Sequence, residues 1–87
     1  MTFTGHVVKV RESRRGGDFA VMFEDKRWNS AFKLMMFKSA LNYLGGSTYA
    51  QQLEGATITV RGLLVNHPKF GYQMILNDRR MVLKVDR

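Results

Sequence analysis

Cysteine is missing from this chain of 87 residues, and proline occurs only once. The absence of cysteine excludes a disulfide framework and any zinc site built on thiolates. Apolar residues form no run near the roughly 18 that suggest a membrane span. Met1 leads directly into Thr2 and Phe3, without the basic and apolar regions of a signal peptide. The sequence therefore predicts a soluble, cytoplasmic protein that has no membrane contact and no structural metal.

Acidic residues are also few, because seven Asp and Glu stand against 14 Lys and Arg and leave a net charge of +7. Residues 1–38 hold eight basic and four acidic side chains, residues 67–87 hold five and two, and the middle holds one of each. Such an excess favours a polyanionic partner, and a fold that joins the two ends would place it on one surface. The alternative is that the charge only keeps the surface soluble.

Hydrophobic residues make up 45% of the chain, which is too many for a disordered basic tail. A chain of this length allows one small domain, residues 1–87, with a modest core. Such a domain leaves little chain for an enzyme.

Alternating side chains predict three strands in the first half of the chain, over Thr4–Glu12, Asp18–Glu24 and Ala31–Phe37. In the second strand, alternation places Phe19, Val21 and Phe23 inward and Ala20 and Met22 outward. Paired glycines supply the positive φ angles of a hairpin turn, so Ser13–Gly17 is expected to join the first two strands and to carry two arginines at its tip.

The second half begins with a predicted helix over Ser39–Leu44, with Ser39 as its N-cap and Gly45 as its C-cap. Thr48 and Gln51 have the spacing of a capping box, which predicts another helical turn. A long strand over Thr57–Asn66 is expected to bend at Gly62, because glycine often marks a bulge or a barrel corner. Two shorter strands follow, over Tyr72–Leu76 and Met81–Val85.

Three strands, a short helix and two strands in this order predict an all-β fold. A small closed barrel hides the edges that five short strands would otherwise expose. The expected architecture is therefore the five-stranded oligonucleotide/oligosaccharide-binding barrel, or OB-fold, with its helix between strands three and four.

Several stretches also resemble bacterial OB-fold nucleic-acid-binding modules. They are Gly5-x-Val7-x-x-Val10, Phe19-x-x-x-Phe23, residues 32–41 (FKLMMFKSAL), residues 53–62 (LEGATITVRG) and residues 71–77 (GYQMILN). The resemblance covers about residues 5–85 and implies single-stranded nucleic-acid binding, like that of the OB domains that accompany nucleases and other DNA-processing enzymes. The chain departs from the family at Gly45–Thr48, where the family's helix often continues.

An OB-fold holds its ligand across strands two and three and between the loops that join strands one to two and four to five. A positive groove tracks the phosphates of a single strand, and aromatic side chains stack on its bases. The candidate binding residues on this surface are Lys9, Arg11, Arg14, Arg15, Trp28, Lys33, Lys69, Phe70 and Tyr72. The alternative role of Phe70 and Tyr72 is to cover the open end of the barrel, and that of Trp28 is structural burial.

Met22, Met35 and Met74 are expected on the same outer face, as an apolar stripe. Such a stripe more often marks a subunit interface than a platform for bases. The alternative function is therefore a protein-interaction or oligomerisation module that docks on itself or on a DNA-processing enzyme.

Enzymatic chemistry finds little support in the sequence. No serine lies in a nucleophile-elbow pattern beside His6 or His67, and no Walker or dinucleotide pattern follows the glycine pair. Asp18, Glu24 and Asp25 are more readily explained as charges that offset their basic neighbours than as a metal site.

We therefore expect a non-catalytic protein without metal or cofactor that binds single-stranded DNA with little sequence preference. RNA is an alternative ligand, since the sequence does not predict contacts to a 2′-hydroxyl.

Overall fold

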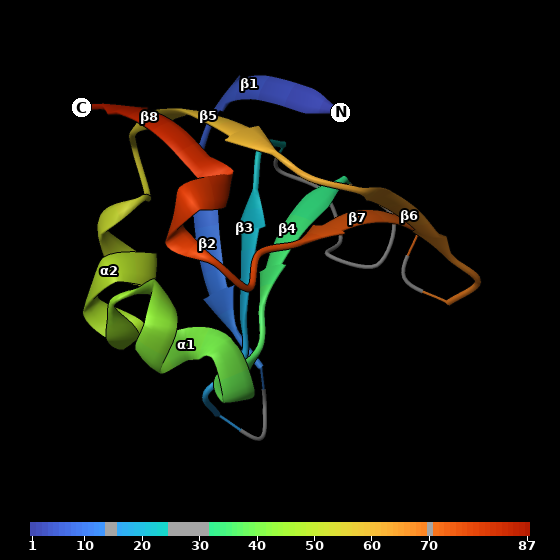
Figure 1. Ribbon diagram of the computed structural model, residues 1–87, viewed down its shortest axis with the longest axis horizontal. Helices are drawn as coiled ribbons and strands as arrows, with labels where there is room; N and C mark the ends of the chain where they lie inside the picture. Colours follow the sequence, from blue (N-terminus) through green and yellow to red (C-terminus); the bar gives the residue numbers. More distant parts are fainter. Residues whose placement is uncertain (14–15, 25–31, 70) are drawn as a thin grey trace.

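Strands dominate the computed structural model, which describes residues 1–13, 16–24, 32–69 and 71–87 (Figure 1). In order along the chain, the elements are β1 (Thr2–His6), β2 (Lys9–Glu12), β3 (Phe19–Met22), β4 (Lys33–Met36), α1 (Lys38–Leu44), α2 (Gly46–Gln52), β5 (Thr57–Arg61), β6 (Leu64–His67), β7 (Gly71–Ile75), the 3-10 turn η1 (Arg79–Met81) and β8 (Val82–Asp86). The fold is a small β-rich domain with two short helices after the fourth strand. Because β1 and β2 together correspond to the first predicted strand, the helices follow the third predicted strand, as expected.

These strands form two sheets. One sheet has the order β1-β5-β8, and the other has the order β2-β3-β4-β7-β6. All neighbours are antiparallel except β4 and β7, which run parallel. Figure 1 shows the three-stranded sheet above the vertical strands β2, β3 and β4, with both chain ends in this upper layer.

A closed five-stranded barrel is not formed by the described strands, because both sheets are open. The reason lies in the two longest predicted strands, each of which breaks in two. The first breaks at Val7 and Val8, where the Val7 N–H donates to Ala56 O at 2.8 Å and the Val8 N–H donates to Met22 O at 2.9 Å. Val8 thus bonds to the five-stranded sheet, whereas Val7 bonds to the residue just before β5, and the chain crosses from one sheet to the other.

The second break confirms the bend predicted at Gly62, which lies between β5 and β6. A Cβ atom at Gly62 would lie 2.6 Å from Met81 Cε and 3.0 Å from Met74 Cγ. Gly62 N–H also donates to Met1 O at 2.9 Å. The bend is therefore closely packed, and any larger residue at position 62 would have to displace Met81 or Met74.

The helices begin and end at different residues than the sequence predicts. Helix α1 begins at Lys38, whose N–H donates to Asp18 Oδ1 at 2.7 Å, so the cap comes from a distant residue and not from Ser39. Gly45 ends α1 as predicted, with a left-handed φ of 110°. Helix α2 begins at Gly46, so Thr48 lies inside the helix and is not its cap.

The core lies between the two sheets and the helices, and Phe19 and Leu34 belong to it as predicted. Helices α1 and α2 contribute Leu41, Leu44 and Ala50. Phe3, Phe23 and Phe32 pack against this core as an aromatic cluster, with the Phe3 ring centroid 4.7 Å from that of Phe23 and 4.8 Å from that of Phe32.

Candidate functional site

The predicted binding surface is the outer face of β2, β3 and β4. Strand register shows which side chains share it, because paired residues point to the same side of a sheet. Lys9 pairs with Met22, Met22 with Lys33, and Lys33 with Gln73. Arg11 pairs with Ala20, and Ala20 with Met35. Lys9 and Arg11 are exposed, so strand β2 carries the basic outer face that the alternation predicts.

Lys33 differs from its predicted place on the exposed surface. It is fully buried, beside Gln73, of which only 6% is exposed. Burial lowers the pKa of Lys33, because removal from water disfavours the charged amine. The exposed position predicted for Lys33 is therefore wrong, and its contact with a nucleic acid remains a prediction.

The predicted methionine stripe is not exposed either. Met74 lies in the main core with Leu34, on the side of the sheet opposite to Lys33. Met22 does lie on the outer face, but only 1% of it is exposed, and it forms a small buried cluster with Ala20 against half-buried Met35. The outward placement predicted for Met74 and the exposure predicted for Met22 are therefore wrong. Contact with a partner through these residues remains a prediction.

Tyr72 and Lys69 are exposed, but the structure does not bring Tyr72 to the face of Lys9 and Arg11. Tyr72 immediately precedes Gln73 on β7 and therefore points to the opposite side of the sheet. Lys69 lies in the β6–β7 turn, where its N–H donates to His67 Nδ1 at 3.1 Å. The remaining candidates lie outside the described residues: Arg14, Arg15, Trp28 and Phe70.

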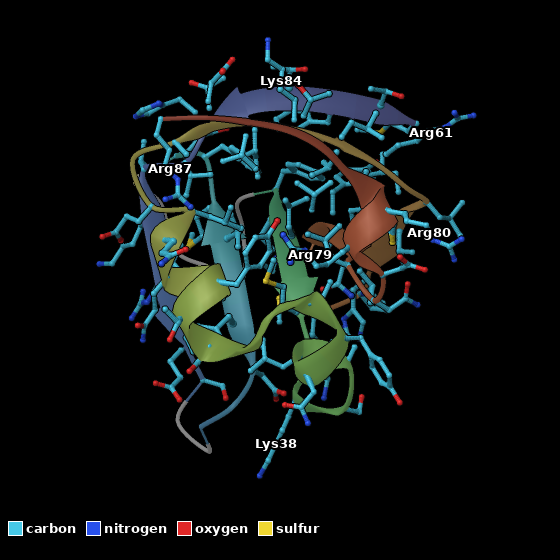
Figure 2. The ribbon with its side chains drawn as sticks, turned by 60° about the vertical axis from the view of Figure 1, so that its left-hand side comes forward. Lys38, Arg61, Arg79, Arg80, Lys84 and Arg87 are labelled. Carbon is cyan, nitrogen blue, oxygen red and sulfur yellow. The ribbon has the colours of Figure 1, made fainter. Side chains whose placement is uncertain are left out.

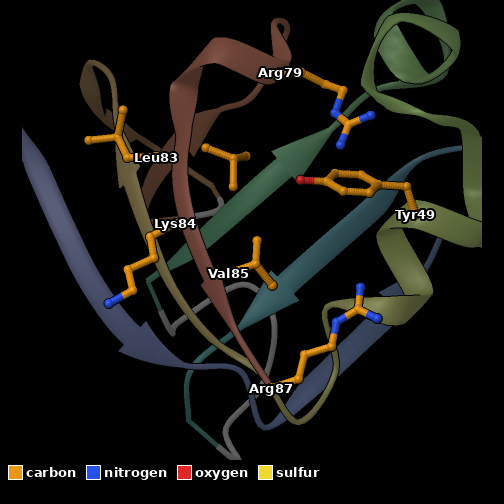
Figure 3. A pocket seen from close by; sticks show the side chains of 7 residues that line it. Tyr49, Arg79, Leu83, Lys84, Val85 and Arg87 are labelled. Carbon is orange, nitrogen blue, oxygen red and sulfur yellow. The ribbon is translucent and has the colours of Figure 1, made fainter.

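A second basic region, outside the predicted binding surface, lies where α2, η1 and β8 meet. Figure 2 shows Arg79 and Arg87 on this side of the molecule, with Lys84 at its top edge and Arg80 at its right-hand edge. Here the structure contains an open pocket of about 380 Å³, seen closely in Figure 3. We call it the β8 pocket. It is lined by Tyr49, Arg79, Val82, Leu83, Lys84, Val85 and Arg87.

Two local features position the aromatic and cationic side chains of the β8 pocket. Tyr49 projects from α2 beside Gly45, where a Cβ atom would lie 3.0 Å from Tyr49 Cβ. Arg79 begins η1, and its Cζ atom lies 4.6 Å from the Tyr49 ring centroid. A guanidinium over a tyrosine ring is a stabilising cation–π contact. Figure 3 shows this pair at one end of the pocket and Arg87 at the other.

Asp78 fixes the turn that carries Arg79. Its Oδ1 accepts a hydrogen bond from Arg80 N at 2.9 Å, and its Oδ2 lies 2.7 Å from Arg80 Nη2. These hydrogen bonds to Arg80 lower the pKa of Asp78 from 3.8 to about 2. The turn therefore keeps its charged cap into more acidic solution than an ordinary aspartate would, and the Arg79 side chain is left to contact Tyr49.

Over the described ranges, no three His, Asp or Glu side chains lie close enough together to hold a metal ion. The described helices also include none that is long and apolar enough to cross a membrane. The sequence signal that points to the β8 pocket is its arginines, which belong to the basic excess of residues 67–87; Tyr49 joins them only through the fold.

Comparison with known proteins found no match to the chain among family models, curated proteins or solved structures. The fold and the two basic regions therefore define the class of this molecule by themselves: a small β-rich domain with exposed cations on β2 and a cation-rich pocket at β8.

Proposed function

We propose that the chain is a non-catalytic domain that binds single-stranded nucleic acid, most readily DNA, with little sequence preference. The observation that carries the proposal is the exposed cationic row of Lys9 and Arg11 on β2, in a chain with a net charge of +7. Cations spaced along one strand suit a phosphate backbone, which supplies most of the affinity in sequence-independent binding.

The strand order supports a relation to the OB-fold. If β1 and β2 count as two halves of one bent strand, and β5 and β6 as two halves of another, the pairings run in the order one, two, three, five, four. In this numbering, the pairing of β1 with β5 places the fourth combined strand next to the first. This order supports the proposed relation to the OB-fold, while the described strands themselves form two open sheets. β8 is an additional strand on the free side of β5.

Titration of a fluorescent oligo(dT) with the protein tests the proposal. We expect binding at 50 mM salt that weakens as salt rises, because a single strand releases about 0.7 counterion for each phosphate contact. Arg11→Gln should reduce the log–log salt slope by about 0.7. Arg61→Gln is the matched control, because Arg61 is also exposed on a strand but lies in the other sheet. No binding at 50 mM salt, or equal slopes for the two variants, would contradict the proposal.

A protein-contact module is the second candidate function, and one observation favours it. Leu63 is 77% exposed at the β5–β6 bend, and Tyr72 is 53% exposed on β7. Leu64 shares a face of the β6–β7 hairpin with Tyr72, since Leu64 pairs with Met74 and Asn66 pairs with Tyr72. Exposed apolar side chains that lie together are a common feature of protein contacts.

A further inference from the structure

The β8 pocket combines three kinds of surface that one ligand can use together. Val82 and Val85 are apolar, Tyr49 is aromatic, and Arg79 and Arg87 are cationic. These side chains come from α2, η1 and the end of the chain around β8, and none lies on the five-stranded sheet. The pocket is therefore a feature separate from the cationic row of β2.

Charge is not balanced inside this pocket. Lys84 lines the pocket, but its Nζ lies 3.2 Å from Asp86 Oδ2, and Arg80, outside the lining, pairs with Asp78, so these two cations already have carboxylate partners. Arg79 and Arg87 form no ion pair within the described part of the chain. Arg87 Nη2 instead donates to the neutral Gln52 Oε1 at 3.3 Å. Two guanidinium groups without a carboxylate partner can accept an anion at little cost, and phosphate suits their planar donors.

The neighbouring surface favours a planar group next to that anion. Tyr49 is half-buried and already carries the Arg79 guanidinium over its ring. Nucleobases stack on both tyrosine rings and guanidinium planes. The pocket volume of about 380 Å³ lies within the usual range for small-molecule sites, about 300–1,000 Å³. The pocket therefore offers room for about one nucleotide.

We propose that the β8 pocket binds one nucleotide unit. Its phosphate lies at Arg87, and its base lies against Tyr49 and Arg79 above the apolar Val82 and Val85. The unit is either a free mononucleotide or one residue of a single strand. The proposal does not rest on strand binding by β2, because none of the pocket residues belongs to that strand.

Calorimetry and ¹⁵N-resolved NMR with dTMP, thymidine and inorganic phosphate test this proposal at 50 mM salt. We expect dTMP to bind more tightly than either fragment and to shift the amide signals of Tyr49 and Arg87. Arg87→Gln should weaken dTMP about tenfold, as expected for the loss of a charge-assisted contact, and should leave thymidine unchanged. Equal binding of phosphate and dTMP would overturn the proposal, because the site would then be a simple anion site.

Two further variants separate the ring from the charge. Tyr49→Leu keeps an apolar side chain but removes the ring, so it should weaken dTMP several-fold and leave phosphate unchanged. Arg61→Gln is the control of equal charge outside the pocket and should change neither ligand. Unchanged dTMP binding in both Arg87→Gln and Tyr49→Leu would overturn the proposal, whatever the effect of Arg61→Gln.

An oligo(dT) arm distinguishes the two sources of the nucleotide. If the pocket holds one residue of a strand, oligo(dT) shifts the same amide signals, and Arg87→Gln weakens both oligo(dT) and dTMP. If the ligand is a free mononucleotide, dTMP shifts these amide signals and oligo(dT) does not. Either outcome supports a nucleotide site in the pocket. Arg11→Gln belongs to the β2 surface and should weaken oligo(dT) only. Failure of strand binding by β2 is thereby distinguishable from failure of the pocket.

Discussion

Lys33 shows how much the surroundings of one residue decide its role. Alternation places it correctly on the outer face of β4, in line with Lys9 and Met22. A lysine at such a position is ordinarily exposed, because burying a charged amine is costly. Its burial depends on what packs over the outer face, and no local pattern in the sequence reports that.

The lowered pKa of Lys33 has a measurable consequence for stability. The folded state holds this proton less tightly than the unfolded chain, so the unfolded state binds more protons and the free energy of unfolding rises as pH rises toward 10.5. We expect Lys33→Met to reduce that rise between pH 7 and pH 10 in urea denaturation. Lys9→Met removes an exposed lysine from the same face of the sheet, so it should leave the rise in place. Equal pH dependence of the two variants would contradict the assignment.

The β8 pocket marks the limit of prediction at the residue scale. Tyr49 and Arg87 are far apart in the sequence, and no spacing rule relates them. The arginines are visible in the sequence as part of the basic excess near the end of the chain. The sequence does not show that Arg80 has a carboxylate partner and Arg79 has none among the described residues. Asp78 engages Arg80 and leaves Arg79 to the tyrosine, and this distinction between neighbours comes from the turn geometry.

At the scale of elements, side-chain alternation located every strand of the described chain to within a few residues. It did not show that β3 is buried on both faces, because a strand with two buried faces needs no polar alternation and Ala20 and Met22 fit either environment. Alternation also predicted one continuous strand for β1 and β2, and another for β5 and β6. The breaks within these two strands depend on pairing with distant strands, which is why the predicted barrel differs from the two sheets observed.

The β5–β6 bend provides the prediction at this scale. A methyl group at Gly62 would press on Met74 in the core and on the flexible end of Met81. We expect Gly62→Ala to lower the free energy of unfolding by about 1–3 kcal/mol, as overpacking usually does. Met81→Ala combined with it should cost less than the sum of the two single changes, since it removes the nearest atom. Strict additivity in urea denaturation would argue against this steric explanation.

At the scale of the whole molecule, the net charge of +7 opposes self-association while the exposed Leu63 and Leu64 favour it. Salt separates these effects, because the Debye length falls from about 10 Å at 0.1 M to about 3 Å at 1 M. We expect sedimentation to show a 10.0 kDa monomer at both concentrations. Association at 1 M salt that Leu63→Ser and Leu64→Ser abolish would favour the protein-contact function instead.

The central place of β5 also has a consequence for the order of folding. β5 pairs with β1 on one side and with β8 on the other, so its sheet joins the first and the last strands of the chain (Figure 1). Contacts this distant in sequence slow folding, because the intervening chain must be ordered before they form. During synthesis, one edge of β5 stays unpaired until β8 has emerged from the ribosome. Nascent chains that stall before Val82 would therefore carry an open strand edge, which is the feature that promotes aggregation.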